Sequence, residues 1–174
     1  MALTIAELDC AGGRLALSPL PGRGGAFEAD LRVLILWSPD LVISMTTGDE
    51  MAAKGAAPLG TEMEGRGTVW RHLPIPDFGT PDGDTAARFP AVAAEALATL
   101  RAGGRVLIHC MGGCGRSGMA ALRLMVEAGE DPTAALTRLR AVRPCAVETE
   151  AQFAWAAQAA SPPGGEVGPV AQIP

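Results

Sequence analysis

The sequence predicts an α/β fold in which a central, largely parallel sheet is flanked by helices on both faces. Two observations lead to this prediction: short β-type segments alternate with longer amphipathic segments, and the chain ends in a block of helical patterns. With 174 residues the chain is long enough to bury a substantial core. We expect a single domain over 1–160, followed by a loosely ordered tail over 161–174, where no periodicity is present.

The predicted strands are short runs rich in aliphatic residues and bounded by glycine, proline or aspartate. They cover 3–9, 14–22, 41–46, 68–75 and 105–110. The first two surround Cys-Ala-Gly-Gly and are expected to form a hairpin.

The predicted helices show apolar residues at helical spacing. They cover 24–40, 85–104, 116–129, 131–142 and 148–160, with one or two short helices within 48–67. Asp131 followed by Pro132 is typical of a helix start, because aspartate caps the first turn and proline is tolerated just inside it.

Composition limits the function classes. The net charge of −5 gives no basic surface for nucleic acid or for an anionic membrane. No apolar run approaches the roughly 20 residues of a membrane span, and the first residues do not form a signal peptide. The four cysteines are unevenly spaced and contain no Cys-x-x-Cys pair, so we expect no disulfide framework, no structural zinc site and a reducing, cytoplasmic location. They are Cys10, Cys110, Cys114 and Cys145.

The segment 108–118, Ile-His-Cys-Met-Gly-Gly-Cys-Gly-Arg-Ser-Gly, joins a predicted strand to a predicted helix. Unpaired backbone N–H groups and the helix dipole make such a junction a binding site for phosphate or sulfate. The predicted phosphate-binding residues are Met111, Gly112, Gly113, Cys114, Gly115 and Arg116. Cys110 lies at the strand end in this positive field, where it should be a thiolate nucleophile. The alternative is a buried cysteine followed by a flexible glycine turn.

This segment resembles the signature loop of the cysteine-dependent protein tyrosine and dual-specificity phosphatases, His-Cys-x-x-Gly-x-x-Arg-Ser/Thr. Every fixed position matches: His109, Cys110, Gly113, Arg116 and Ser117. A nucleotide-binding Walker A loop is excluded, since no Gly-Lys-Ser/Thr is present.

Two further segments extend the resemblance over roughly 14–160. Residues 73–82, Leu-Pro-Ile-Pro-Asp-Phe-Gly-Thr-Pro-Asp, look like the mobile general-acid loop, especially that of the cyclin-dependent kinase inhibitor 3 type. Asp77 then matches the general acid, with Asp82 as the alternative. Residues 146–156 resemble the late helix start that would put Gln152 near the hydrolytic water.

The resemblance implies a phosphomonoester hydrolase that works through a cysteinyl-phosphate, without cofactor or metal. Cys110 would attack phosphorus, Arg116 would clamp two phosphate oxygens, and Asp77 would protonate the leaving oxygen. Ser117 would help the cysteine sulfur to leave, and His109 would orient the loop. The expected substrates are phosphorylated proteins or small phosphomonoesters. The uncharged variable loop positions disfavour a polyanionic inositol head group.

Other functions remain open at this point. The chain could be a catalytically weak module that binds phosphoproteins, or a rhodanese-like sulfur transferase. Arsenate reduction is disfavoured because no clearly placed resolving cysteine pair follows. A zinc site at His109, Cys110 and Cys114 is disfavoured because the loop would repel a cation. Cys114 could instead form a disulfide with Cys110 under oxidation.

Overall fold

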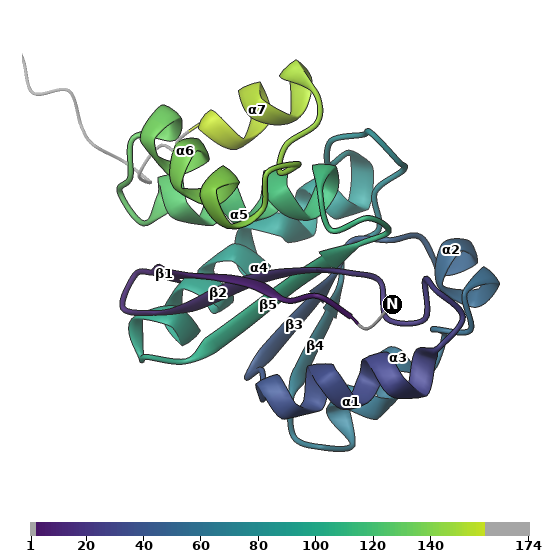
Figure 1. The fold of residues 1–174 in the computed structure, drawn as a ribbon. Helices are drawn as coiled ribbons and strands as arrows, with labels where there is room; N and C mark the ends of the chain where they lie inside the picture. The colour runs from purple at the N-terminus through teal and green to yellow at the C-terminus, as the bar shows by residue number, and fades with distance from the viewer. Residues whose placement is uncertain (1–2, 159–174) are drawn as a thin grey trace, which may run out of the picture.

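The computed structural model describes residues 3–158 and contains a five-stranded sheet in the order β1-β2-β5-β3-β4 (Figure 1). The strands are β1 (Ala6–Cys10), β2 (Gly13–Pro19), β3 (Leu41–Ser44), β4 (Val69–His72) and β5 (Arg105–Cys110). β1 pairs antiparallel with β2, as the hairpin pattern predicted, and the other neighbours pair in parallel. The predicted tail over 161–174 lies outside the described residues.

The helices alternate with the strands and then follow one another after β5. They are α1 (Phe27–Trp37), α2 (Gly48–Ala53), α3 (Leu59–Glu64), α4 (Gly83–Arg101), α5 (Gly115–Glu127), α6 (Pro132–Val142) and α7 (Glu150–Ala157). Among residues 3–158, none is both long enough and apolar enough to cross a bilayer.

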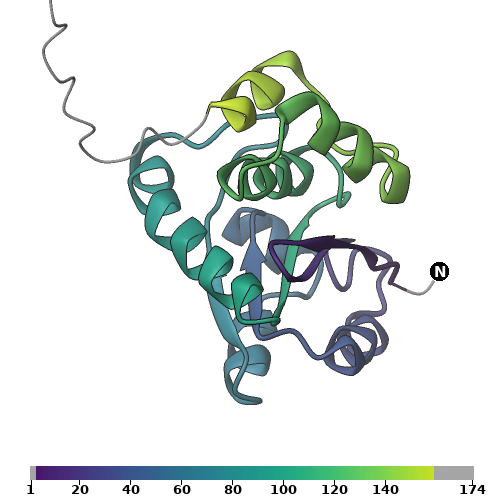
Figure 2. The same ribbon diagram turned by 90° about the vertical axis from the view of Figure 1, so that its left-hand side faces the viewer.

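Each face of the sheet is covered by helices, which confirms the predicted fold class (Figures 1 and 2). On one face, α1 and α3 bury an apolar cluster against β2, β3 and β5 that includes Leu34, Leu59 and Leu107. On the other, α4 and α5 bury a larger cluster that includes Leu100, Ile108 and Leu122. Strands covered on both faces are apolar at nearly every position, as the fully buried pattern of β3 shows.

The parallel arrangement decides where a site can form. β2, β3, β4 and β5 all end at the same edge of the sheet, so the loops that follow them meet there. The register places Pro19 beside Cys110 and Ser44 beside His109. The predicted signature loop therefore lies beside segments that are up to about 90 residues away in sequence, as the pairing of Pro19 with Cys110 shows.

Candidate active site

The signature loop runs from the end of β5 into the first turn of α5. Cys110 is 3 % exposed, and its Sγ lies 3.2 Å from the Ser117 Oγ. Cys110 also lines a cavity of about 310 Å³, together with Asp77 and Phe78. The sequence thus brings the predicted nucleophile and its predicted hydroxyl partner into contact.

The backbone of the loop turns its carbonyl groups outward. The Met111 carbonyl accepts from the Leu20 N–H at 3.4 Å, and the Cys114 carbonyl accepts from the Gly118 N–H at 2.8 Å. Among the described residues, the N–H groups of 112–116 donate to no carbonyl. Gly113 has a φ of +69° and lies against the Ser18–Pro19 backbone, where a Cβ atom would clash. The loop therefore presents free donors to an anion.

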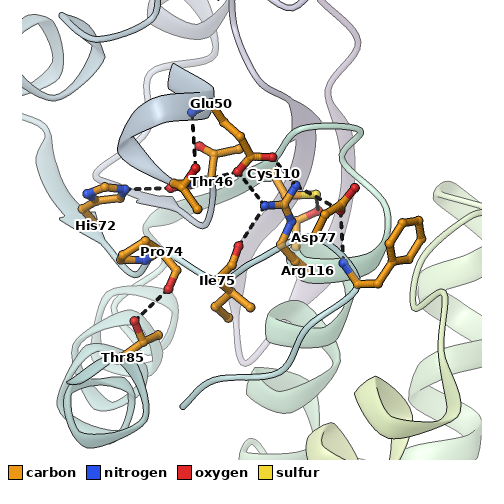
Figure 3. Close-up of polar contacts among 12 residues, drawn as sticks. Thr46, Glu50, His72, Pro74, Ile75, Asp77, Thr85, Cys110 and Arg116 are labelled. Atoms are coloured by element: carbon orange, nitrogen blue, oxygen red, sulfur yellow. Dashed lines mark hydrogen bonds and ion pairs between the residues drawn. The ribbon is translucent and has the colours of Figure 1, made fainter. Parts of the chain in front are cut away.

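Arg116 is buried at 1 % exposure and is held on two sides (Figure 3). Its Nη1 donates to Glu50 Oε2 at 2.8 Å and to the Ile75 carbonyl at 2.9 Å, and its Nη2 donates to Glu50 Oε1 at 2.9 Å. Nη2 also lies 3.1 Å from Asp77 Oδ1. Its Nε is buried and has no partner among the described residues, so one donor of the guanidinium is left for a ligand.

The ionic surroundings keep Arg116 charged. Burial opposes the charge, but the hydrogen bonds of Glu50 and the nearby Cys110 sulfur outweigh it and raise the pKa of Arg116. In return, the hydrogen bonds from Arg116 lower the pKa of Glu50 against the effect of its own partial burial. The phosphate-binding cradle, which is formed by Arg116 and the backbone of residues 111–115, thus carries a permanent positive charge.

Glu50 was missed by sequence reasoning. It is the third residue of α2 and closes a capping box with Thr47, whose N–H donates to Glu50 Oε2 at 2.8 Å. The Thr-Gly-Asp-Glu stretch carries that capping signal. Nothing in the stretch indicates that the same carboxylate also reaches Arg116, 66 residues away.

The two candidate acids are placed differently. Asp77 faces Arg116 and lines the cavity that contains Cys110, although its side chain is 59 % exposed. Asp82 is the N-cap residue of α4, and among residues 3–158 it forms neither a hydrogen bond nor an ion pair with Arg116 or Cys110. The geometry therefore favours Asp77. The neighbouring Phe78 has a φ of +59° and an exposed ring, so this loop holds a strained conformation at the cavity.

His109 is fully buried behind the nucleophile. Its Nε2 lies 2.6 Å from the Ser44 Oγ, which in turn accepts from the Trp70 indole N–H at 2.8 Å. Ser44 Oγ accepts from Trp70 and keeps both a hydrogen and a second lone pair, so it can pair with Nε2 of a neutral His109 in either tautomer. Burial is the main cause that lowers the pKa of His109 to about 3. Ser44 and Trp70 were not predicted as part of this arrangement.

Acidification should destabilise the fold through His109. An unfolded histidine binds a proton below about pH 6.5, but the folded one does so only near pH 3. Between these values the unfolded chain holds more protons, so stability falls as pH decreases. We expect the free energy of unfolding, measured with urea, to fall by about 2 kcal/mol when the pH is lowered from about 7.5 to about 5. His109→Asn should remove this dependence, whereas His72→Asn should keep it. A wild-type stability that stays flat over this range would contradict the assignment.

Gln152 is buried at the start of α7 and both ends of its amide are bonded to backbone. Its Oε1 accepts from the Glu148 N–H at 3.0 Å, and its Nε2 donates to the Gly79 carbonyl at 3.3 Å. Gln152 therefore ties α7 to the loop that carries Asp77. It also lies against Gly115, at the edge of the cradle.

The structure corrects the predictions about cysteines. Cys114 forms a disulfide with Cys145, which the expectation of no disulfide framework did not include, and Cys114 is therefore paired with Cys145 rather than with Cys110. Cys110 is a free cysteine. The pairing was not evident from the sequence because the segment after α6 folds back over the loop, which brings the two Cα atoms within 5.1 Å across 31 residues.

Comparison with known proteins gives a family model and curated relatives. Residues 26–156 match the model described as Swiss Army Knife protein, DSP-PTPase phosphatase domain. The chain is 42 % identical over 90 residues to cyclin-dependent kinase inhibitor 3 of Mus musculus, and 40 % identical over 91 residues to that of Rattus norvegicus. Each alignment covers 50 % of this chain but only 41 % of the relative's length.

Solved structures with the same fold cover nearly the whole chain. Kinase associated phosphatase, in a form whose catalytic-site cysteine is replaced by serine, matches with a TM-score of 0.78 and 25 % identity, over 90 % of this chain and 93 % of that chain. Tk-PTP in its active form matches with a TM-score of 0.66 and 32 % identity, over 86 % and 92 % of the two chains.

Proposed function

The chain belongs to the family of DSP-PTPase phosphatase domains, and from this premise we propose that it is a cysteine-dependent phosphomonoester hydrolase of the protein tyrosine and dual-specificity type. One observation carries the proposal: the buried Arg116 keeps an unpartnered Nε beside a free Cys110 and a loop of unpaired N–H groups. A cradle of this kind fits the three equatorial oxygens of a transferring phosphoryl group.

In the first step, the Cys110 thiolate attacks phosphorus and the bond between phosphorus and the ester oxygen breaks. Asp77 gives its proton to that oxygen, so the alcohol or phenol leaves neutral. Arg116 and the N–H groups of the loop stabilise the charge that spreads over the phosphoryl oxygens. The product is a cysteinyl-phosphate.

In the second step, the Asp77 carboxylate takes a proton from water, which attacks phosphorus as the sulfur–phosphorus bond breaks. The hydroxyl of Ser117, 3.2 Å from the sulfur, donates to the departing thiolate. Inorganic phosphate is released. The hydrogen bond from Gln152 to the Gly79 carbonyl supports a role for Gln152 in holding the loop that carries Asp77. This role is additional to the predicted one, in which Gln152 positions the hydrolytic water.

The substrate class that we propose is a phosphorylated protein side chain or a small aryl phosphate, held as the anion in the loop. The location that we propose is cytoplasmic. A disulfide is compatible with that compartment where it is transient and redox-responsive. Fractionation of cells that express the tagged chain would test the location.

The test of the function is hydrolysis of a generic aryl phosphate at mildly acidic pH with chelator present. We expect chelator-resistant turnover, and rapid acid quenching followed by mass spectrometry should find phosphate on Cys110. Turnover of thiosulfate with persulfide on Cys110 would favour sulfur transfer instead. A folded protein that binds phosphopeptides without turnover would be a binding module.

Asp77→Asn should lower kcat by about 10²- to 10³-fold, because the leaving oxygen loses its proton donor. The fall in kcat at high pH, where a general acid loses its proton, should disappear in this variant. Asp82→Asn is the matched control, and its pH–rate profile should keep the wild-type shape. The reverse result, with Asp82→Asn as the impaired variant, would assign the acid to Asp82. Steady-state kinetics across pH distinguish the two.

A further inference from the structure

A short segment between α6 and α7 lies against the outside of the signature loop. This clamp segment, residues 143–148, makes several kinds of contact with it. Arg143 hydrogen-bonds the loop backbone, Cys145 forms the disulfide with Cys114, and the Val147 N–H donates to the Cys114 carbonyl at 3.3 Å. The segment itself is anchored by Arg140, which donates to the Ala146 and Val147 carbonyls.

Arg143 contacts the part of the loop that has the least restraint of its own. Its Nε donates to the Gly113 carbonyl at 2.9 Å, and its Nη2 donates to the Gly112 carbonyl at 2.6 Å. Glycine at both positions leaves the backbone free to adopt many conformations. A planar guanidinium that holds two successive carbonyls restricts that freedom, since its donors are fixed relative to each other.

The direction of these carbonyls decides what the anion meets. In a trans peptide, the C=O group of one residue and the N–H group of the next point in opposite directions. When Arg143 holds the Gly112 and Gly113 carbonyls outward, the N–H groups of Gly113 and Cys114 must point inward. Arg143 lines the cavity that contains Cys110, and through its hydrogen bonds to the two carbonyls it determines the orientation of two N–H donors of the phosphate-binding loop.

The disulfide links the clamp segment covalently to the part of the loop that Arg143 contacts. Cys145 is two residues from Arg143, and Cys114 follows Gly113 directly. Cys145 is exposed, so a thiol reductant from solvent can reach the disulfide. Reduction by a dithiol transfers two electrons and two protons, leaving thiols at Cys114 and Cys145 and a disulfide in the reductant.

We propose that Arg143 is a positioning residue for the phosphate-binding loop, and that the Cys114–Cys145 disulfide keeps the clamp segment on the loop, so that its reduction lowers phosphatase activity. This inference rests on the proposed function. The Cys114–Cys145 disulfide does not include the nucleophile, so the disulfide-bonded form of the protein is the more active one as long as Cys110 itself stays reduced.

Arg143→Gln and Arg143→Lys test the positioning role. Lysine keeps the charge but cannot hold two carbonyls in a fixed geometry. We expect both variants to lose about 10- to 100-fold in kcat, since small displacements of catalytic groups have effects of this size. Arg23→Gln is the matched control, because Arg23 lines the cavity that contains Cys110 and Arg143 but, among the described residues, its side chain makes no hydrogen bond to the loop. Its effect should fall on KM and on the salt dependence of KM.

Binding of tungstate supplies a readout that does not depend on turnover. Calorimetry on Cys110→Ser should show that adding Arg143→Gln weakens tungstate binding by about tenfold or more, while the melting temperature shows that the fold persists. If Arg143→Lys retains wild-type kcat and tungstate affinity, the positioning role is wrong although the proposed function stands. If the wild type neither turns over an aryl phosphate nor binds tungstate, the proposed function itself fails, and the inference with it.

The redox part is tested by anaerobic reduction with dithiothreitol. Alkylation and peptide mass spectrometry report the state of each cysteine, with Cys110 required to be reduced throughout. We expect kcat/KM of the wild type to fall several-fold when Cys114–Cys145 is reduced, to the value of Cys145→Ser, which should not respond to reductant. Cys10→Ala, which alters the other free cysteine, should respond like the wild type. Equal or higher activity after reduction, or the absence of the disulfide in aerobically purified protein, would overturn the redox part.

Discussion

The Cys110→Ser variant is expected to lose turnover of an aryl phosphate by about 10⁴-fold or more while it continues to bind phosphate-like anions. The serine hydroxyl is a far weaker nucleophile than a thiolate, and no other free thiol lines this cavity among the described residues. Binding should persist because Arg116 and the loop N–H groups do not depend on the sulfur. Steady-state kinetics and tungstate calorimetry measure the two properties separately.

Cys10→Ala provides the control for the loss of a buried thiol. Cys10 lies at the end of β1, where burial raises the pKa of its thiol to about 11, and it should be dispensable for turnover. Residual activity above about one per cent in Cys110→Ser would show that the reaction does not pass through a cysteinyl-phosphate. Such activity would need to resist a chelator, so that a contaminating metal phosphatase is excluded.

The second large effect is expected from Arg116→Lys, which should lower kcat/KM by about 10³-fold. Lysine retains the positive charge, but it cannot hold both oxygens of Glu50 and still offer a donor to the phosphate. The buried Nε that is free in the wild type has no counterpart in lysine. Transition-state stabilisation should therefore suffer more than ground-state binding, so kcat falls more than KM rises.

Arg71→Lys is the matched control for this exchange. Arg71 makes a similar two-pronged ion pair with Glu95, at 2.9 Å through both Nε and Nη2, but at the half-exposed surface. Its replacement should leave kcat/KM near the wild-type value. Glu50→Gln, which keeps the shape and removes the charge, should show a smaller loss than Arg116→Lys. Wild-type activity in Arg116→Lys would mean that catalysis does not need the planar, multiply donating guanidinium of Arg116.

The sequence predicted the strands and helices well because each carries a local signal. One difference with a clear cause is at β4, which was expected over 68–75 and ends at His72. Pro74 and Pro76 follow, and proline cannot donate to a strand ladder, so the chain leaves the sheet and enters the Asp77 loop. α4 begins at Gly83, two residues before the predicted start, and continues through Pro90.

The core of the site was also predictable, since the signature loop is contiguous, and the family comparison confirms the resemblance that it suggested. The groups that support the loop were not predictable. Glu50 lies 66 residues from Arg116, and Ser44 lies 65 residues from His109. Arg143 and Cys145 reach the loop from about 30 residues away. Such contacts depend on which strands become neighbours, and no local pattern records that.

The position of the clamp segment has a consequence for synthesis. A ribosome releases the chain from the N-terminus, so Cys110 and Arg116 emerge well before residues 143–148. A nascent chain that ends before Arg143 already has the nucleophile, but lacks the two donors that turn the glycine carbonyls outward. The phosphate-binding loop can therefore reach its final form only after the clamp segment, residues 143–148, has been synthesised and has folded onto it.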